Sequence, residues 1–293
     1  MAAFLSTSCY GRKPLIEAIE LCKKITPRNI EISAPHDYQP LEETAAILRK
    51  YKTEGISFTL HNYFPVPEKS FVLNIAADDE AGYNASSDLV KKALYLAKIS
   101  DAPIYGIHAG YLSKAKANEE GYFEFDQEEV KYEKAFQKAV EFITGFAGDF
   151  KKSNISLIVE NLFPSPKKRH SLNCTYEEIS SFFDSVPNNI GFLLDLGHLN
   201  VSSNVLQFDR NKILDKILSN LSNRILEIHI SENNGLKDDH MAVKENSWQL
   251  DAIKDIKEAT KNNKKEVVYC VEARNADENE LRKSINLVNN IIV

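Results

Sequence analysis

The amino-acid sequence predicts an α/β fold in which a single domain, residues 1–293, forms a (β/α)8 barrel. Three observations support this prediction. Short apolar runs alternate along the whole chain with longer segments of helical period. The length of 293 residues suits such a barrel, which typically needs about 250 residues. No linker and no shift in composition divides the chain.

Eight runs rich in β-branched and apolar residues, each bounded by turn residues, indicate strands. In chain order they are residues 4–8, 29–33, 57–60, 104–108, 156–160, 191–195, 225–229 and 267–272. Strands that alternate strictly with helices imply a parallel sheet covered by those helices. A doubly wound open sheet would use the same elements, so their order alone leaves both arrangements open.

Amphipathic stretches between these runs indicate eight helices. Three of them carry clear apolar stripes: Leu89, Ala93, Leu96 and Ile99; Phe136, Val140, Ile143 and Phe150; and Leu281, Ile285 and Val288. The longest irregular connection is expected from Tyr111 to Asp126, directly after the fourth strand. Active-site loops of a barrel follow the strands, so this connection is either a functional loop or a solvated insertion.

The composition argues against nucleic-acid and membrane partners. The formal net charge is −6 and no basic stripe is present, whereas nucleic-acid binding depends on neutralising phosphates. No apolar run approaches the ~20 residues of a membrane span, and no secretory signal is recognised at the start. The four cysteines are scattered, as in proteins of a reducing compartment, so a cytoplasmic location is predicted. A homo-oligomer is compatible with this composition.

Ionisable residues stand at the ends of six consecutive predicted strands, where an inward-facing position is normally apolar. They are His61, His108, Glu160, Asp195, His229 and Glu272, joined by His198 and by Asp238 and His240 in the loop after the seventh strand. The carboxyl ends of all barrel strands open on one face, so these side chains are expected to converge.

A divalent metal is the physical reason for such a cluster. Buried carboxylates without a cation would repel one another and cost several kcal/mol in desolvation. Mixed imidazole and carboxylate ligands suit zinc, manganese, cobalt or iron better than calcium or magnesium. Cys270 is expected on the same side as Glu272, but no other cysteine shares that setting, so thiolate ligation is not predicted.

Taken in order, the motifs ENLF, DLGH, HISENNGLKDDH and VEAR resemble the xylose-isomerase-like TIM barrel superfamily. It contains ketose 3-epimerases, hydroxypyruvate isomerase, inosose dehydratase and endonuclease IV, and the resemblance runs from the first strand to the last helix. Relatives usually continue the third motif with a Gly-Glu-Gly turn, where this chain has Lys244, Glu245 and Asn246. Because of this difference, the family pattern does not predict the shape of the loop after the seventh strand.

The resemblance implies a manganese or zinc site holding one to three ions. Epimerase-like members hold one metal with four residues, which match Glu160, Asp195, His229 and Glu272. Endonuclease IV holds three zinc ions with nine ligands, and that set adds His61, His108, His198, Asp238 and His240. The ligand residues therefore fit both branches of the superfamily.

Two functions follow from the resemblance. The first is a metal-dependent isomerase or epimerase acting on a sugar or sugar phosphate through a metal-stabilised enediolate. The second is an endonuclease IV-like, zinc-dependent phosphodiester hydrolase acting on abasic DNA. The segment SAPHDYQPLEE, where endonuclease IV has a DNA-penetrating arginine, lacks Arg and Lys, and this favours the small sugar substrate. A barrel that keeps the metal site without catalysis is a third reading.

If the substrate is a sugar, one of the two glutamates, Glu160 and Glu272, is expected to remove a proton from it and the other to return one. His198 is expected to contact a substrate oxygen. His61, His108 and Arg274 are the expected substrate-binding residues, although Arg274 would equally serve in a surface ion pair. Three aromatic residues, Tyr63, Phe64 and Phe163, are expected either to line an apolar wall of the pocket or to pack beneath the loops.

Overall fold

Eight parallel strands close into a barrel in the computed structural model, which describes residues 2–117, 123–274 and 276–293. The order around the barrel is β1-β10-β9-β8-β7-β4-β3-β2, so the open-sheet alternative does not apply. The strands are β1 (Phe4–Ser6), β2 (Asn29–Ile32), β3 (Ser57–His61), β4 (Ile104–His108), β7 (Ser156–Glu160), β8 (Gly191–Asp195), β9 (Ile225–Ile230) and β10 (Val268–Val271).

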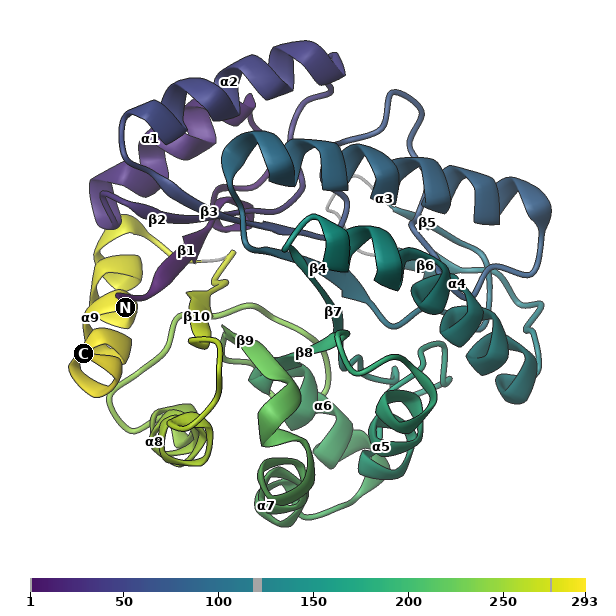
Figure 1. The fold of residues 1–293 in the computed structure, drawn as a ribbon. Helices are drawn as coiled ribbons and strands as arrows, with labels where there is room; N and C mark the ends of the chain where they lie inside the picture. Colours follow the sequence, from purple (N-terminus) through teal and green to yellow (C-terminus); the bar gives the residue numbers. More distant parts are fainter. Residues whose placement is uncertain (1, 118–122, 275) are drawn as a thin grey trace.

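Helices surround the ring of strands, and both termini lie beside β1 and α9 (Figure 1). The helices are α1 (Leu15–Ile25), α2 (Leu41–Thr53), α3 (Glu80–Ser100), α4 (Tyr132–Lys152), α5 (Tyr176–Ser185), α6 (Leu196–Leu206), α7 (Arg210–Leu221), α8 (Trp248–Thr260) and α9 (Glu278–Ile292), with short 3-10 turns at Thr7–Tyr10 and Ser222–Arg224. In the described part of the chain, no helix is long and apolar enough to cross a membrane.

The expectation of eight helices was wrong by one, because two helices lie between β8 and β9. The first of them, α6, ends at Gln207, which adopts a left-handed conformation with φ 57°. The second begins two residues later, where the Asp209 side chain accepts hydrogen bonds from the backbone N–H groups of Asn211 and Lys212. An N-cap of this kind satisfies donors that a new helix leaves open.

The connection after β4 is more ordered than expected. Within the predicted irregular stretch, β5 (Ala115–Ala117) pairs antiparallel with β6 (Phe123–Phe125). Residues 118–122 of the stretch lie outside the described residues. A longer connection without helix or strand is formed by residues 62–79, between β3 and α3. Both connections follow strands at the carboxyl-end face of the barrel.

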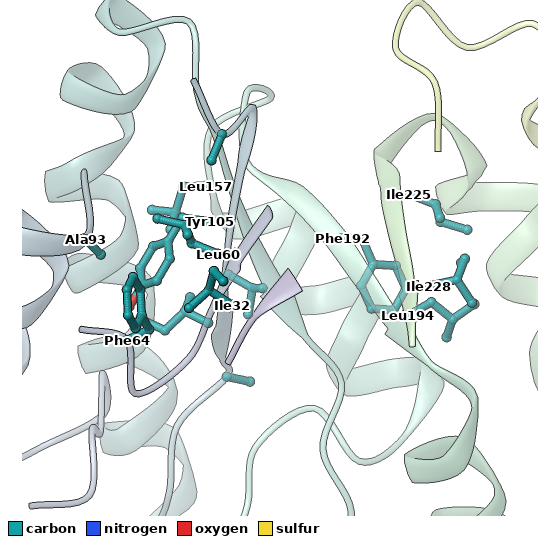
Figure 2. Close-up of a cluster of buried hydrophobic side chains, with 14 of the residues drawn as sticks. Ile32, Leu60, Phe64, Ala93, Tyr105, Leu157, Phe192, Leu194, Ile225 and Ile228 are labelled. Carbon is teal, nitrogen blue, oxygen red and sulfur yellow. The ribbon is translucent and has the colours of Figure 1, made fainter. Parts of the chain in front are cut away.

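Strand alternation divides the barrel side chains between two regions. Outward residues such as Leu60, Tyr105 and Leu194 pack against the helices in the main hydrophobic core (Figure 2). A second apolar cluster fills the inside of the barrel, formed by Phe4, Ile104, Ile158, Leu193, Leu226, Val268 and Cys270. The polar strand-end residues lie beyond this inner cluster, so the apolar layer closes the barrel beneath them.

The tight interior generates a test of the fold. A Cβ on Gly191, at the start of β8, would lie 2.6 Å from side-chain carbons of both Ile158 and Leu226. Gly191→Ala is therefore expected to lower the free energy of unfolding in urea by about 1–3 kcal/mol, the usual cost of overpacking a core.

The matched control is Gly145→Ala in α4, where no atom lies within 4 Å of an added Cβ. Alanine in an exposed helix interior is expected to raise stability by up to about 1 kcal/mol. Equal unfolding midpoints for the two variants would contradict the described packing inside the barrel.

Candidate metal centre

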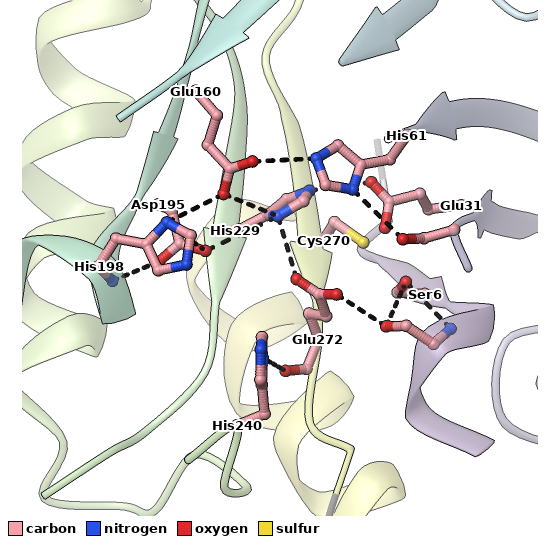
Figure 3. Close-up of polar contacts among 12 residues, drawn as sticks. Ser6, Glu31, His61, Glu160, Asp195, His198, His229, His240, Cys270 and Glu272 are labelled. Atoms are coloured by element: carbon pink, nitrogen blue, oxygen red, sulfur yellow. Dashed lines mark hydrogen bonds and ion pairs between the residues drawn. The ribbon is translucent and has the colours of Figure 1, made fainter. Parts of the chain in front are cut away.

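All nine predicted ligand residues lie at the carboxyl-end mouth of the barrel, and Figure 3 shows most of them converging on Glu160 and His229. Glu160, the last residue of β7, is 1% exposed. Its Oε2 atom lies 3.0 Å from His61 Nε2 and 3.3 Å from His108 Nε2. Its other oxygen, Oε1, lies 3.1 Å from His198 Nδ1. One buried carboxylate thus links residues from strands β3, β4 and β7 and from helix α6.

A second group surrounds His229, which is fully buried at the end of β9. The Nδ1 atom of His229 lies 3.3 Å from Glu272 Oε2, 3.8 Å from Asp195 Oδ2 and 3.9 Å from Glu160 Oε1. Both His229 Nδ1 and Asp195 Oδ2 are buried without a hydrogen-bond partner among the described residues. Unpaired buried polar atoms are costly, so these two, facing further carboxylate oxygens, fit a cation that they would share.

A third group lies beside the second. His198 Nε2 is 3.4 Å from Asp238 Oδ2, and His240 Nε2 is 2.5 Å from the same oxygen. The Asp238 Oδ1 atom is buried and also lacks a hydrogen-bond partner within the described chain. The loop after β9 therefore brings Asp238 and His240 to the mouth, as the sequence predicted, although its Gly-Glu-Gly turn is absent.

Each of the five mouth histidines has one ring nitrogen held by a hydrogen-bond partner away from the carboxylate cluster. Four are held through Nδ1: His61 by Ser33 Oγ, His108 by the Tyr111 hydroxyl, His198 by the carbonyl of Asn161 and His240 by the carbonyl of Glu272. Their Nε2 atoms face carboxylates, and His198 Nδ1 also lies 3.1 Å from Glu160 Oε1. His229 is reversed: its Nε2 contacts Glu31 Oε2 at 2.9 Å and its Nδ1 faces the cluster. Such fixed ring orientations are typical of metal-binding histidines.

Hydrogen bonds connect the motif ENLF at the end of β7 with the motif DLGH at the end of β8. The Asn161 side chain bonds the backbone of Asp195 twice: its Nδ2 donates to the Asp195 carbonyl at 3.0 Å, and its Oδ1 accepts from the Asp195 N–H at 2.8 Å. Asp195 Oδ1 in turn caps α6 by accepting from the His198 N–H. This clamp fixes the ends of β7 and β8 to each other and leaves Asp195 Oδ2 free for the cluster.

The cluster shifts the pKa values of its carboxyl groups in opposite directions. Burial, reinforced by the negative charges of Glu160 and Asp238, raises the pKa of Asp195 to about 6. Burial also acts to raise the pKa of Glu160, but His108 and His198 outweigh it and hold that pKa well below its usual range. Without a cation, the ionised form of Asp195 is therefore disfavoured by burial and by the neighbouring carboxylates.

Glu272 presents its two oxygens to different partners. Oε1 accepts hydrogen bonds from Ser8 Oγ at 2.8 Å and from Arg274 Nη2 at 3.2 Å, which leaves Oε2 facing His229. The Arg274 guanidinium, expected at the substrate, thus forms an ion pair with Glu272, and the side chain of Arg274 is 33% exposed. Arg274 orients a candidate ligand in this arrangement, and its outward edge remains accessible from the mouth.

Aromatic side chains border the His108 side of the mouth. Phe123 of β6 lies edge-on to Tyr63 and to Tyr111, with ring centroids 5.4 and 5.7 Å apart, and the Tyr63 ring is edge-on to His108 at 5.8 Å. Phe163 lies 4.7 Å from the His198 ring. Phe64, by contrast, is 2% exposed and packs in the main core. Tyr63 and Phe163 thus border the site, whereas Phe64 supports it from beneath.

Sequence reasoning missed two buried carboxylates inside the barrel. Glu31 on β2 and Glu227 on β9 are both fully buried, and Glu227 Oε1 accepts a hydrogen bond from Thr59 Oγ1 at 3.2 Å. Burial raises the pKa of Glu227 to about 8. The available signal was a glutamate in the middle of each apolar run, NIEIS and ILEIHI, at an inward position of the strand alternation.

The chain is similar to known proteins in sequence pattern and in fold. The family model for xylose isomerase-like TIM barrels matches residues 16–291. No curated protein has a significantly similar sequence.

Three solved structures illustrate the similarity of the fold. A D-tagatose 3-epimerase-like protein superposes with a TM-score of 0.74 at 18% identity, over 100% of this chain and 97% of its own. A D-psicose 3-epimerase, determined in the presence of D-fructose, gives 0.69 at 17% identity over 100% and 99%. A protein from Thermus thermophilus soaked with ZnCl2 gives 0.62 at 14% identity over 98% and 96%. Identities this low establish a common fold only.

The unpaired oxygen of Asp195 leads to a test of metal binding. Asp195→Asn is expected to abolish tight binding of zinc or manganese, since no other carboxylate of β8 reaches the cluster. Asparagine is as good an N-cap as aspartate, so α6 and the melting temperature should be largely kept. Metal content after dialysis, measured by mass spectrometry, checks the expectation.

The matched control is Asp209→Asn, which makes the same change at the N-cap of α7, far along the chain from the cluster. Wild-type metal content is expected there. An Asp195→Asn protein with wild-type metal content would remove Asp195 from the ligand set.

Proposed function

The chain belongs to the xylose isomerase-like TIM barrel family, and from this premise we propose that it is a metal-dependent isomerase or epimerase acting on a sugar or sugar phosphate. The proposal rests chiefly on one observation: two glutamates from separate strands, Glu160 and Glu272, face the same pair of unpartnered buried atoms, His229 Nδ1 and Asp195 Oδ2. Similarity in fold to a D-tagatose 3-epimerase-like protein and to a D-psicose 3-epimerase supports it.

Glu160, Asp195, His229 and Glu272 would hold the metal ion. A bound divalent ion supplies Lewis-acid stabilisation of negative charge that develops on substrate oxygens. Zinc and manganese both suit this mixture of one imidazole and three carboxylates. The buried atoms without partners are the feature of this chain that fits such an ion.

Glu160 and Glu272 are the residues proposed to transfer the proton. Isomerisation and epimerisation break a C–H bond next to a carbonyl: a base takes the proton, and the electron pair that remains gives a planar enediolate intermediate, which is then protonated again. β7 and β10 are separated by β8 and β9 around the barrel, so Glu160 and Glu272 approach the mouth from different sides. One carboxylate can remove the proton from one face of the plane while the other returns a proton to the opposite face.

The surroundings of the cluster suit a small polyhydroxylated substrate. His198 Nε2, His61 and His108 offer polar contacts to hydroxyl groups, and the aromatic border formed by Tyr63 and Phe123 offers an apolar face for the C–H side of a sugar. The net charge of −6 and the absence of Lys and Arg from residues 33–43, the stretch after β2, disfavour a phosphate backbone as substrate.

One specific observation keeps phosphodiester hydrolysis as a second candidate. Of the two flanking groups, His61, His108 and Glu160 bring their ligand atoms close enough to hold a further ion. In the other, His198 and His240 both lie near Asp238 Oδ2. Together with the central group they account for the full ligand set that the resemblance to endonuclease IV implies. Phosphodiester hydrolysis of this kind requires three ions in the active protein, whereas sugar isomerisation or epimerisation requires one.

Metal stoichiometry separates these candidates. We expect one tightly bound ion per chain after dialysis against a weak chelator, and no cleavage of an abasic duplex at near-physiological salt by protein loaded with excess zinc. Elemental analysis and a gel-based cleavage assay check the two expectations. Three retained ions together with robust cleavage would reverse the ranking of the two functions.

Proton exchange with solvent tests the chemistry directly. In deuterated water, a ketose substrate should gain deuterium at the carbon next to its carbonyl, which mass spectrometry detects. Glu272→Gln is expected to slow this exchange by at least about 10²-fold, the usual scale for loss of a general base. Metal content must be measured alongside, because Glu272 is also a proposed ligand.

Glu245→Gln, in an exposed position of the loop after β9, is the control and should exchange at the wild-type rate. Turnover of an identified substrate without deuterium uptake would point to an internal hydride shift. Undiminished exchange by metal-replete Glu272→Gln would exclude that residue as the base.

A further inference from the structure

His229 differs from the other mouth histidines in two respects. It faces the cluster through Nδ1 alone, whereas His61, His108 and His240 face it through Nε2. His198 contacts Glu160 through Nδ1 and Asp238 through Nε2. The outer nitrogen of His229 is paired with the carboxylate of Glu31, whereas the outer nitrogens of His61, His108 and His240 are paired with hydroxyl or carbonyl oxygens. Both differences trace to one residue, Glu31.

Glu31 reaches His229 across the inside of the barrel. It lies on β2, whose neighbours are β1 and β3, whereas His229 lies on β9, between β8 and β10. The Glu31 Oε2 atom is 2.9 Å from His229 Nε2, and both residues are 0% exposed (Figure 3). In the parallel register, Glu31 lies beside Ser6 and Thr59, which places it one layer deeper than the strand-end residues.

A carboxylate at this depth needs a reason. Removing it from water costs several kcal/mol unless it is paired. Among the ion pairs of the described residues, Glu31 has His229 as its sole partner, and its Oε1 atom has no hydrogen bond. Glu31 also lies close enough to His61 and His229 to share an ion with them. It is outside the proposed ligand set, however, and its one direct contact there is with His229 Nε2.

We propose that Glu31 is a positioning residue of the metal centre: it accepts the Nε2 proton of His229 and so directs the Nδ1 lone pair toward Asp195, Glu160 and Glu272. A carboxylate in this position fixes the tautomer and ring orientation of the histidine and increases the electron density of the nitrogen that binds the metal. The inference rests on the metal site of the proposed function but is independent of which substrate is turned over.

Zinc alone is a sufficient probe. Protein labelled with ¹⁵N at histidine is titrated with Zn²⁺ against a competing chelator, and the His229 ring signals are assigned from their absence in His229→Asn. In wild-type protein, zinc should bind Nδ1, and Nε2 should carry a slowly exchanging, strongly downfield proton that is hydrogen-bonded to a carboxylate. If zinc binds His229 through Nε2 in the wild-type protein, that result alone overturns the proposal, and no Glu31 variant is needed.

Glu31→Gln removes the charge at nearly constant shape. We expect the zinc dissociation constant at the His229 signals to rise by about 10- to 100-fold, the scale seen when an outer partner of a metal ligand is lost. The Nε2 proton should also move upfield, because a neutral amide oxygen is a weaker acceptor than a carboxylate. Thermal unfolding of the metal-free protein shows whether the barrel has remained folded.

The matched control is Glu227→Gln. Glu227 is also fully buried inside the barrel, but its carboxylate accepts from Thr59 rather than from a histidine. This variant should keep zinc affinity within about threefold and leave the Nε2 proton unshifted, on the same affinity scale. Equal loss in both variants would show a general effect of altering a buried carboxyl group inside the barrel. Wild-type affinity in Glu31→Gln would show a purely structural glutamate, and either result overturns the proposal.

Glu31→Asp covers the case in which the glutamine variant does not fold. It keeps the negative charge but shortens the side chain by one methylene, so the contact with His229 Nε2 should lengthen and zinc affinity should again fall. A folded Glu31→Asp protein with wild-type affinity and an unshifted Nε2 proton would contradict the positioning role. Loss of sugar turnover without these changes would concern the proposed function alone.

Discussion

The contacts of Glu160 with four histidines are the constraint on which the mouth of the barrel depends. A single carboxylate, 1% exposed, places one oxygen near His61 and His108 and the other near His198 and His229. Each of these rings comes from a different element, so none can move without leaving a buried group unpaired. The cost of such unpaired groups explains why every outer ring nitrogen is held by a separate partner. The orientation of the whole cluster follows from this single anionic centre.

The layers of side chains inside the barrel differ in polarity, and this difference allows the cluster to be buried. The deepest layer is apolar and seals the barrel. The next layer contains Glu31, Thr59 and Glu227, and only the last layer, at the strand ends, carries the candidate ligands. Strand alternation places each of these residues inward, and the hydrogen bond from Thr59 to Glu227 and the contact between Glu31 and His229 offset part of the desolvation cost. The middle layer therefore supports the ligands rather than merely filling space.

Much of the fold and of the cluster could be predicted from the sequence because the relevant signals are local. Apolar runs identified all eight barrel strands, and an ionisable residue at the end of six consecutive runs identified the mouth. The supporting contacts are different in kind: Glu31 and His229 are 198 positions apart, and their pairing appears only once the barrel closes. The boundary between α6 and α7 depended on the left-handed conformation of Gln207, which the helical period conceals. Likewise, Phe123 could not be recognised as a neighbour of Tyr63 before the hairpin of β5 and β6 was known.

The electrostatics of the cluster affect both metal binding and the basicity of the carboxylates at this mouth. Burial and neighbouring carboxylates raise the pKa of Asp195 to about 6, while histidines keep the pKa of Glu160 well below its usual range. The ionised form is therefore favoured at Glu160 and disfavoured at Asp195, whose Oδ2 has no hydrogen-bond partner among the described residues. An arriving divalent cation would meet a preformed, incompletely neutralised site, and its charge would favour the ionised form of Asp195. The same cation would lower the basicity of Glu160 and Glu272, so a carboxylate acting as a base must recover basicity when substrate displaces water from the mouth. In the proposed function, exclusion of water by the bound substrate would therefore be part of what makes a metal-bound glutamate basic enough to remove the proton.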